Sequence, residues 1–81
     1  MTEEELKSAH RHCSYHRKEV EASSEAGCFY CLETFLPSEI EEWCDEGQTA
    51  LCPKCGIDSV IGNAAVGLSN QFLAEMHCYW F

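Results

Sequence analysis

Two cysteine pairs constrain the fold of this chain more than any other feature of its sequence. Cys28 and Cys31 form the first pair, and Cys52 and Cys55 form the second after an insert of twenty residues. Each Cys-x-x-Cys turn can present two thiolates, and two such turns complete a tetrahedral four-sulfur shell. The sequence therefore predicts a structural Zn²⁺ site with these four cysteines as its ligands.

The length of the chain makes such a site important for stability. A domain of 81 residues buries a modest share of its surface, so its apolar core alone leaves little net stability. Zinc binding to a small thiolate site contributes about 10 kcal/mol, which is comparable to the stability of a whole domain. We expect residues 1–81 to form one zinc-binding domain that unfolds when the metal is removed.

Cysteine usage and hydropathy bear on the compartment. The chain has seven cysteines, an odd number, and it opens Met-Thr-Glu-Glu-Glu without the basic and apolar regions of a secretory signal. No apolar run approaches the roughly 18 residues of a membrane span. These features predict a cytoplasmic protein with no membrane partner, in a compartment where paired cysteines usually hold metal.

The net charge of −9 is unevenly distributed. Four of the five Lys and Arg residues precede Ala22, and after it Lys54 is the only one, against nine acids. Nucleic-acid affinity depends largely on Lys and Arg at phosphates, so no nucleic-acid binding is expected. A protein partner with a basic surface suits this chain better.

Periodicity and turn signals predict helices at both ends of an α+β fold. Residues 2–22 lack Gly and Pro and begin with a capping Thr and three Glu, and residues 68–80 carry apolar side chains at helical spacing after Ser69. Residues 27–62 form the zinc core, with short strands near 32–35, 49–51 and 57–61 and a helical turn over 37–43. This pattern predicts a zinc-ribbon or treble-clef-like core flanked by the two helices.

Several segments resemble a family of small, uncharacterised bacterial proteins described as cytoplasmic. The resemblance implies a cytoplasmic zinc-binding fold with no established activity, and its Cys-Pro-Lys-Cys-Gly half is specific for metal but not for function. It is carried by Gly27–Cys31, Pro37, Glu39-Ile40, Trp43, Thr49–Gly62, His16-Arg17, Phe72-Leu73, Met76-His77 and Tyr79–Phe81.

A second group of metal-ligating residue types lies outside the pairs. On a helix, His12 with His16, or Cys13 with His16, would share one face within reach of a metal. A solvated helix face is the favoured interpretation, and a second metal or active site stays an alternative. Its candidate residues are His10, His12, Cys13, His16, Cys44, His77 and Cys78.

Other chemistry at the cysteine pairs is disfavoured by what is missing from the sequence. Iron also accepts four thiolates, but no electron-transfer motif accompanies them. Four protein thiolates leave no open position for a catalytic water. The zinc-deaminase signature needs His-x-Glu, which is absent from the sequence. In a nuclease, the histidine base would have to be His16 or His77, and Asn63 could hold the catalytic ion.

The leading functional hypothesis is a non-enzymatic protein-interaction module with an acidic surface, and a regulatory role is one version of it. An acidic mimic that inhibits a nucleic-acid-binding protein and a metal-dependent hydrolase or nuclease are the alternatives. A homodimer through Tyr79, Trp80 and Phe81 is a further hypothesis, because such a small chain has difficulty burying three large aromatic side chains. Asp58, Ser59 and Asn63 follow the second pair and are expected to make capping bonds or a binding surface.

Overall fold

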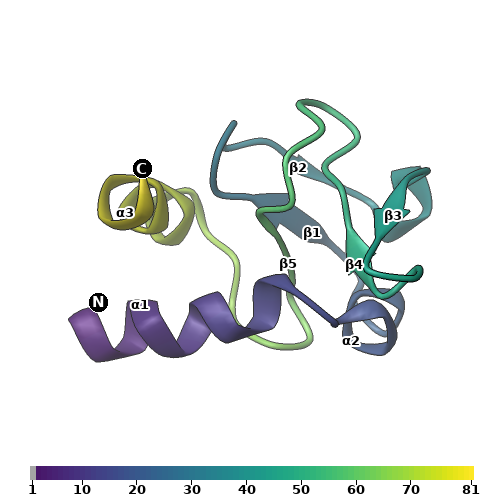
Figure 1. Ribbon diagram of the computed structural model, residues 1–81. Coiled ribbons are helices and arrows are strands. Elements are labelled where there is room, and N and C mark those ends of the chain that lie inside the picture. The colour runs from purple at the N-terminus through teal and green to yellow at the C-terminus, as the bar shows by residue number, and fades with distance from the viewer. Residues whose placement is uncertain (1) are drawn as a thin grey trace.

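A computed structural model describes residues 2–81, with two helices at one end of the molecule and the short strands together with a shorter helix at the other (Figure 1). Figure 1 shows two helices, α1 (Glu3–His10) and α3 (Asn70–Trp80), side by side near both chain termini. The strands β1 (Ala26–Cys28), β2 (Thr34–Phe35) and β5 (Val60–Gly62) form an antiparallel sheet in the order β2-β1-β5. The hairpin of β3 (Trp43–Cys44) and β4 (Thr49–Ala50) lies beyond the sheet, next to α2 (Arg17–Glu21).

The ends of α1 and α3 follow the local sequence. The Thr2 hydroxyl accepts a hydrogen bond from the Glu5 N–H at 3.2 Å, and three Glu side chains occupy the positive first turn of α1. The Ser69 hydroxyl accepts one from the Phe72 N–H at 3.0 Å and caps α3. The two predicted capping residues are confirmed.

The expected single helix over residues 2–22 is wrong, because the chain breaks between α1 and α2. A short 3₁₀ turn covers Arg11–Cys13, and Tyr15 then takes a left-handed conformation with φ 49°. Bonds to the β4 segment replace the helical ones: the Tyr15 N–H donates to the Thr49 hydroxyl at 2.9 Å, and the His16 N–H donates to the Gln48 carbonyl at 2.8 Å. Tertiary hydrogen bonds therefore override the helical preference of these residues.

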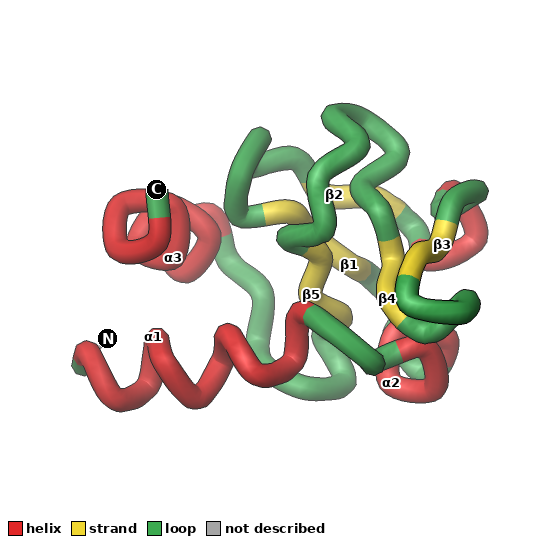
Figure 2. The backbone as a smooth tube through the Cα atoms, viewed as in Figure 1, coloured by secondary structure: helices red, strands yellow, loops and turns green. Residues whose placement is uncertain are grey.

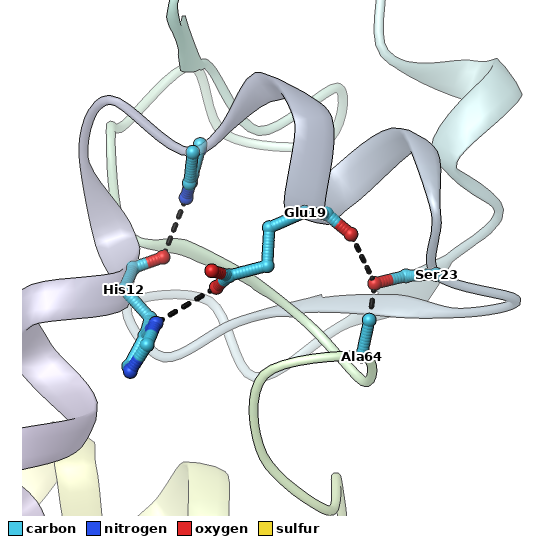
Figure 3. A network of polar contacts seen from close by, with 5 residues as sticks. His12, Glu19, Ser23 and Ala64 are labelled. Atoms are coloured by element: carbon cyan, nitrogen blue, oxygen red, sulfur yellow. Dashed lines mark hydrogen bonds and ion pairs between the residues drawn. The ribbon is translucent and has the colours of Figure 1, made fainter.

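The His16 side chain fixes the same connection from inside the protein. It is buried, and its Nε2 accepts a hydrogen bond from the Ala50 N–H at 3.0 Å while Nδ1 donates to the His12 carbonyl. Figure 3 shows the His12 carbonyl as part of a network of polar contacts. In this network the His12 ring contacts the Glu19 carboxylate, and the Ser23 hydroxyl donates to the Glu19 carbonyl and accepts from the Ala64 N–H. A carbonyl can only accept and an N–H can only donate, so His16 is the neutral tautomer with its proton on Nδ1.

The helical turn expected over residues 37–43 is shorter than predicted. A 3₁₀ turn covers Pro37–Glu39, after which Ile40 is extended at φ −75° and ψ 119° and Trp43 enters β3 (Figure 2). Ile40 is buried, and the Arg17 guanidinium lies 4.4 Å from the centre of the Trp43 ring. Strand pairing with β4 competes successfully with helix formation in this segment.

The sheet separates two apolar clusters because consecutive residues of a strand face opposite sides. Ile61 of β5 packs with α1 and α3, whereas Val60 packs with α2 and the cysteine turns. The helix-side cluster comprises Leu6, Ala9, Cys13, Phe29, Ile61, Phe72, Leu73 and Met76. The other comprises Val20, Ala26, Cys28, Phe35, Ile40, Ala50, Cys52 and Val60. Within residues 2–81, no helix has the length and apolarity needed to cross a membrane.

Protonation of His16 should destabilise the fold. Burial lowers the pKa of His16, although the His12 carbonyl and the Glu19 carboxylate oppose this shift. An unfolded histidine gains its proton near pH 6.5. Below that pH the unfolded state therefore binds more protons than the folded state, and the free energy of unfolding should fall as the pH decreases.

A His16→Gln variant isolates this contribution, because Gln can still accept from the Ala50 N–H but does not titrate. We expect the variant to be less stable by about 1 kcal/mol at pH 8 and to lose less stability than the wild type between pH 6.5 and 5. Denaturant unfolding of both proteins at each pH, in one metal buffer, measures the difference. Parallel pH profiles would contradict the assignment.

Candidate metal centre

The two cysteine pairs occupy turns at the ends of neighbouring strands. Cys28 ends β1, and the first turn leads to β2, whereas the second turn lies between β4 and β5. Strand pairing places Cys28 directly opposite Val60 in the β1–β5 ladder. The sheet therefore brings together two turns that the sequence separates by twenty residues.

The two turns have the same backbone geometry. In the first, the Leu32 N–H donates to the Cys28 carbonyl at 2.9 Å, and in the second, the Gly56 N–H donates to the Cys52 carbonyl at 2.8 Å. The N–H groups of the leading cysteines also donate to equivalent carbonyls, those of Glu33 at 3.0 Å and Ile57 at 2.9 Å. Each turn is closed by a residue in the left-handed region, with φ 65° at Leu32 and φ 80° at Gly56.

Backbone N–H groups also point at the sulfur atoms. The Tyr30 N–H donates to Cys28 Sγ at 3.4 Å, and the Lys54 N–H donates to Cys52 Sγ at 3.3 Å. Donors of this kind stabilise the thiolate form of cysteine, which is the form that binds metal. The turns thus supply both the position and part of the charge stabilisation.

The four sulfur atoms lie at spacings suited to a single ion. Cys28 Sγ is 3.7 Å from Cys55 Sγ, Cys31 Sγ is 3.6 Å from Cys52 Sγ, and all four lie within 4.8 Å of one another. A tetrahedral site with Zn–S bonds of about 2.3 Å has sulfur atoms about 3.8 Å apart. The residues therefore fit a metal ion such as Zn²⁺.

Burial changes how readily these thiols lose their protons. Cys28 and Cys52 are buried, and Cys31 and Cys55 are half-buried. Burial raises the pKa of Cys28 and of Cys31. Burial also acts upward on the pKa of Cys52, but hydrogen bonds from the Lys54 and Cys55 N–H groups and from neighbouring thiols outweigh it and lower that pKa. Metal must compete with protons here, so binding should release protons and weaken in acid.

The structure does not bring the other histidines and cysteines into a second metal site. Among residues 2–81, the four-cysteine set is the single cluster with metal-binding geometry. Both ring nitrogens of His16 already bond backbone groups, and His12 Nδ1 lies 2.8 Å from a Glu19 carboxylate oxygen. His77 Nδ1 lies 3.1 Å from the Phe29 carbonyl. The break before α2 removes the helical face on which a second site would depend.

The remaining cysteines are free thiols in three different elements, and none belongs to the four-sulfur cluster. Cys13 belongs to the helix-side cluster, Cys44 lies in β3, and Cys78 is exposed on α3. Burial, together with the charge of Asp58, raises the pKa of Cys13 to about 11. Burial and the Asp45 charge also raise the pKa of Cys44. Neither thiol is a ready nucleophile at neutral pH.

One feature of the centre escaped the sequence analysis. Leu32 takes the left-handed conformation that Gly56 takes in the other turn, although leucine does so only at a cost. Aligning Cys-Phe-Tyr-Cys-Leu with Cys-Pro-Lys-Cys-Gly would have indicated the left-handed conformation of Leu32.

Asn63 makes the expected type of bond, since its Oδ1 accepts from the Ser24 N–H at 3.0 Å.

Comparison with known proteins identifies no relative of this chain: no family model, no curated protein and no solved structure matches it. The resemblance to small bacterial proteins therefore gains no support from these comparisons. The four-cysteine cluster is the part of that expectation that the structure supports.

Replacing Gly56 with Ala should test the strain in the second turn. Its φ of 80° is unfavourable for a residue with Cβ, yet a Cβ there would meet no atom within 4 Å. The Gly56→Ala variant should therefore lose about 1 kcal/mol through backbone strain alone. Denaturant midpoints in a common metal buffer measure this loss.

Gly67→Ala is the matched control, because its added Cβ also meets nothing within 4 Å and its backbone is outside the left-handed region. We expect this variant to be as stable as the wild type or slightly more stable. Equal losses in the two variants would show that the conformation of Gly56 is not the cause.

Proposed function

We propose that this protein is a non-enzymatic interaction module in which structural Zn²⁺ holds an acidic surface in place for a basic protein partner. The observation that carries the proposal is the exposure of the acids after Ala22, against the single base Lys54 in that part of the chain. Eight of these nine acids are exposed: Glu25, Glu33, Glu39, Glu41, Glu42, Asp45, Glu46 and Asp58.

Part of this charge gathers at a groove beside the second cysteine turn. The groove has a volume of about 430 Å³ and is lined by Glu39, Glu41, Glu42, Leu51, Cys52, Pro53, Lys54 and Gly56. Lys54 Nζ lies 3.7 Å from a Glu39 carboxylate oxygen. Glu41 and Glu42 form no ion pair with any residue between 2 and 81, so the groove keeps excess negative charge.

Two of the basic residues near the N-terminus pair with acids outside this groove. Lys7 pairs with Glu3 at 3.5 Å and Arg17 pairs with Glu21 at 3.1 Å, each within its own helix. Complementary charge would speed association with a basic protein and favour it over acidic competitors. The surplus charge therefore supports an interaction function.

Zinc is our proposed metal, and a zinc ribbon is our proposed form of the core. Both ligand pairs come from equivalent turns beside strands, and four thiolates saturate a tetrahedral ion, which suits a structural role. A hydrolase is less well supported, because neither His16 nor His77 lines the groove beside the sulfur atoms. We also propose a cytoplasmic location, since reducing conditions keep such thiols available for metal.

Removing one ligand should remove the metal and the fold together. We expect the wild-type protein, purified without added metal, to contain about one zinc per chain, and Cys52→Ser to lose the metal and most of its folded structure. Elemental analysis and circular dichroism measure these two properties. Visible absorption from bound iron would instead identify the redox alternative.

Cys78→Ser is the control, since Cys78 is an exposed cysteine of α3 outside the cluster. It should keep the metal content and thermal stability of the wild type. A Cys52→Ser protein that stayed folded without metal would overturn the structural role of zinc.

Partner binding should depend on salt and on the groove. Proteins captured from a native cytoplasmic extract at about 50 mM salt should be basic and should be released near 0.5 M, because salt screens exposed charges. We expect a Glu41→Gln/Glu42→Gln double variant to capture several-fold less of the same proteins. Quantitative mass spectrometry of the captured fractions gives the comparison.

A Glu4→Gln/Glu25→Gln double variant removes the same charge from other exposed acids and should retain capture. Equal losses from both double variants would assign binding to net charge and would refute a role for the groove. If added nucleic acid competes with the captured proteins, the partner is a nucleic-acid-binding protein and the module acts as its acidic mimic.

A further inference from the structure

A second cavity lies on the helical side of the molecule and shares no lining residue with the groove. It has a volume of about 370 Å³ and forms where the end of α1, the first cysteine turn, the segment before β5 and the end of α3 meet. It is lined by His10, Cys13, Ser14, Phe29, Asp58, Ser59, Trp80 and Phe81. The cavity therefore combines aromatic rings with one carboxylate side chain, that of Asp58.

The aromatic rings come from three separate parts of the chain. The rings of His10 and Trp80 lie 4.1 Å apart, and those of Phe29 and Phe81 lie 5.9 Å apart. Phe29 is buried, but 37% of Trp80 and 58% of Phe81 remain exposed. The final aromatic residues thus line a cavity without being covered by the rest of the chain.

Asp58 supplies the charge of this cavity. It is exposed and forms no hydrogen bond or ion pair with any residue from 2 to 81. Its charge acts on the cavity wall, since it adds to the effect of burial in raising the pKa of Cys13. Neither Lys nor Arg is among the described residues that line the cavity, and His10 is their single basic side chain.

We propose that this cavity binds an arginine side chain of the basic partner, with the guanidinium against the aromatic rings and hydrogen-bonded to Asp58. A guanidinium is flat and weakly hydrated, it stacks on aromatic faces, and it matches a carboxylate with two parallel hydrogen bonds. The inference rests on the proposed function in one respect, namely that the partner is a basic protein.

Other occupants satisfy the cavity less well. A neutral apolar group would leave the Asp58 carboxylate partly desolvated and unpaired, which is costly. An anion would be repelled by Asp58 and by the net charge of −9. The protein already contains one arginine packed on an aromatic ring, since the Arg17 guanidinium lies 4.4 Å from the centre of the Trp43 ring.

The test uses N-acetyl-argininamide as the probe and NMR of the metal-loaded full chain as the measurement. The chain has two tryptophans, so the indole N–H signals of Trp80 and Trp43 report on the cavity and on a site already covered by Arg17. We expect saturable shifts of the Trp80 signal with a Kd of about 1 mM. N-acetyl-citrullinamide, which has nearly the same shape without the charge, should not bind measurably.

Two variants distinguish binding of the probe at the cavity from attraction by the net negative charge of the protein. Asp58→Asn should weaken binding about tenfold, and Trp80→Leu should weaken it several-fold. Glu25→Gln removes an equal charge from an exposed acid that lines neither the groove nor the cavity, and it should leave the Kd unchanged. Equal binding of the citrulline probe, equal effects of Asp58→Asn and Glu25→Gln, or shifts confined to Trp43 would each overturn the proposal.

Light scattering across protein concentrations completes the test. If the chain self-associates and this protects Trp80 from the probe, the cavity is an interface between two copies and the arginine proposal is wrong. If the probe fails to bind a monomer but salt-dependent capture of basic proteins persists, the cavity proposal fails and the proposed function stands. If the probe binds to the cavity but no basic protein is captured, the cavity proposal stands and the proposed function fails.

Discussion

The four sulfur atoms within 4.8 Å of one another are the constraint on which the rest of the structure depends. Thiolates so close together repel one another, so a bound metal ion would stabilise the deprotonated form of this cluster. Once the turns are joined, β1 and β5 are held in register, and the sheet has both faces available for packing. Helices α1 and α3 cover one face of the sheet, and α2 with the cysteine turns covers the other.

Hydrogen bonds join the N-terminal segment to the core, in addition to the apolar packing of Leu6, Ala9 and Val20. The backbone of Tyr15 and His16 and the His16 ring all bond the segment from Gln48 to Ala50. These bonds place α1 next to α3 and α2 next to the hairpin, at opposite ends of the molecule (Figure 1). A continuous helix could not make both contacts.

Four thiolates around one tetrahedral ion would leave it no free position for a substrate. His16 and His77 bond backbone groups and do not line the groove beside the sulfur atoms. Among residues 2–81, the groove with Glu41 and Glu42 and the aromatic cavity with Asp58 carry carboxylates that form no ion pair. The two surfaces share no lining residue, and our proposals assign a cationic partner to both.

The sequence by itself determined the metal-binding turns, the two capping residues, the left-handed Gly56 and the short strands near residues 34, 49 and 60. These features depend on residues close together in the chain, such as cysteine spacing, a hydroxyl before a helix or a glycine after a turn. Tertiary structure alone decided the break at Tyr15, the extended path of Ile40 and Trp43, the structural role of His16 and the meeting of Asp58 with Trp80 and Phe81. Each of these results from contacts between segments distant in sequence, whose combined hydrogen bonding and packing outweigh local preferences of a few tenths of a kcal/mol per residue.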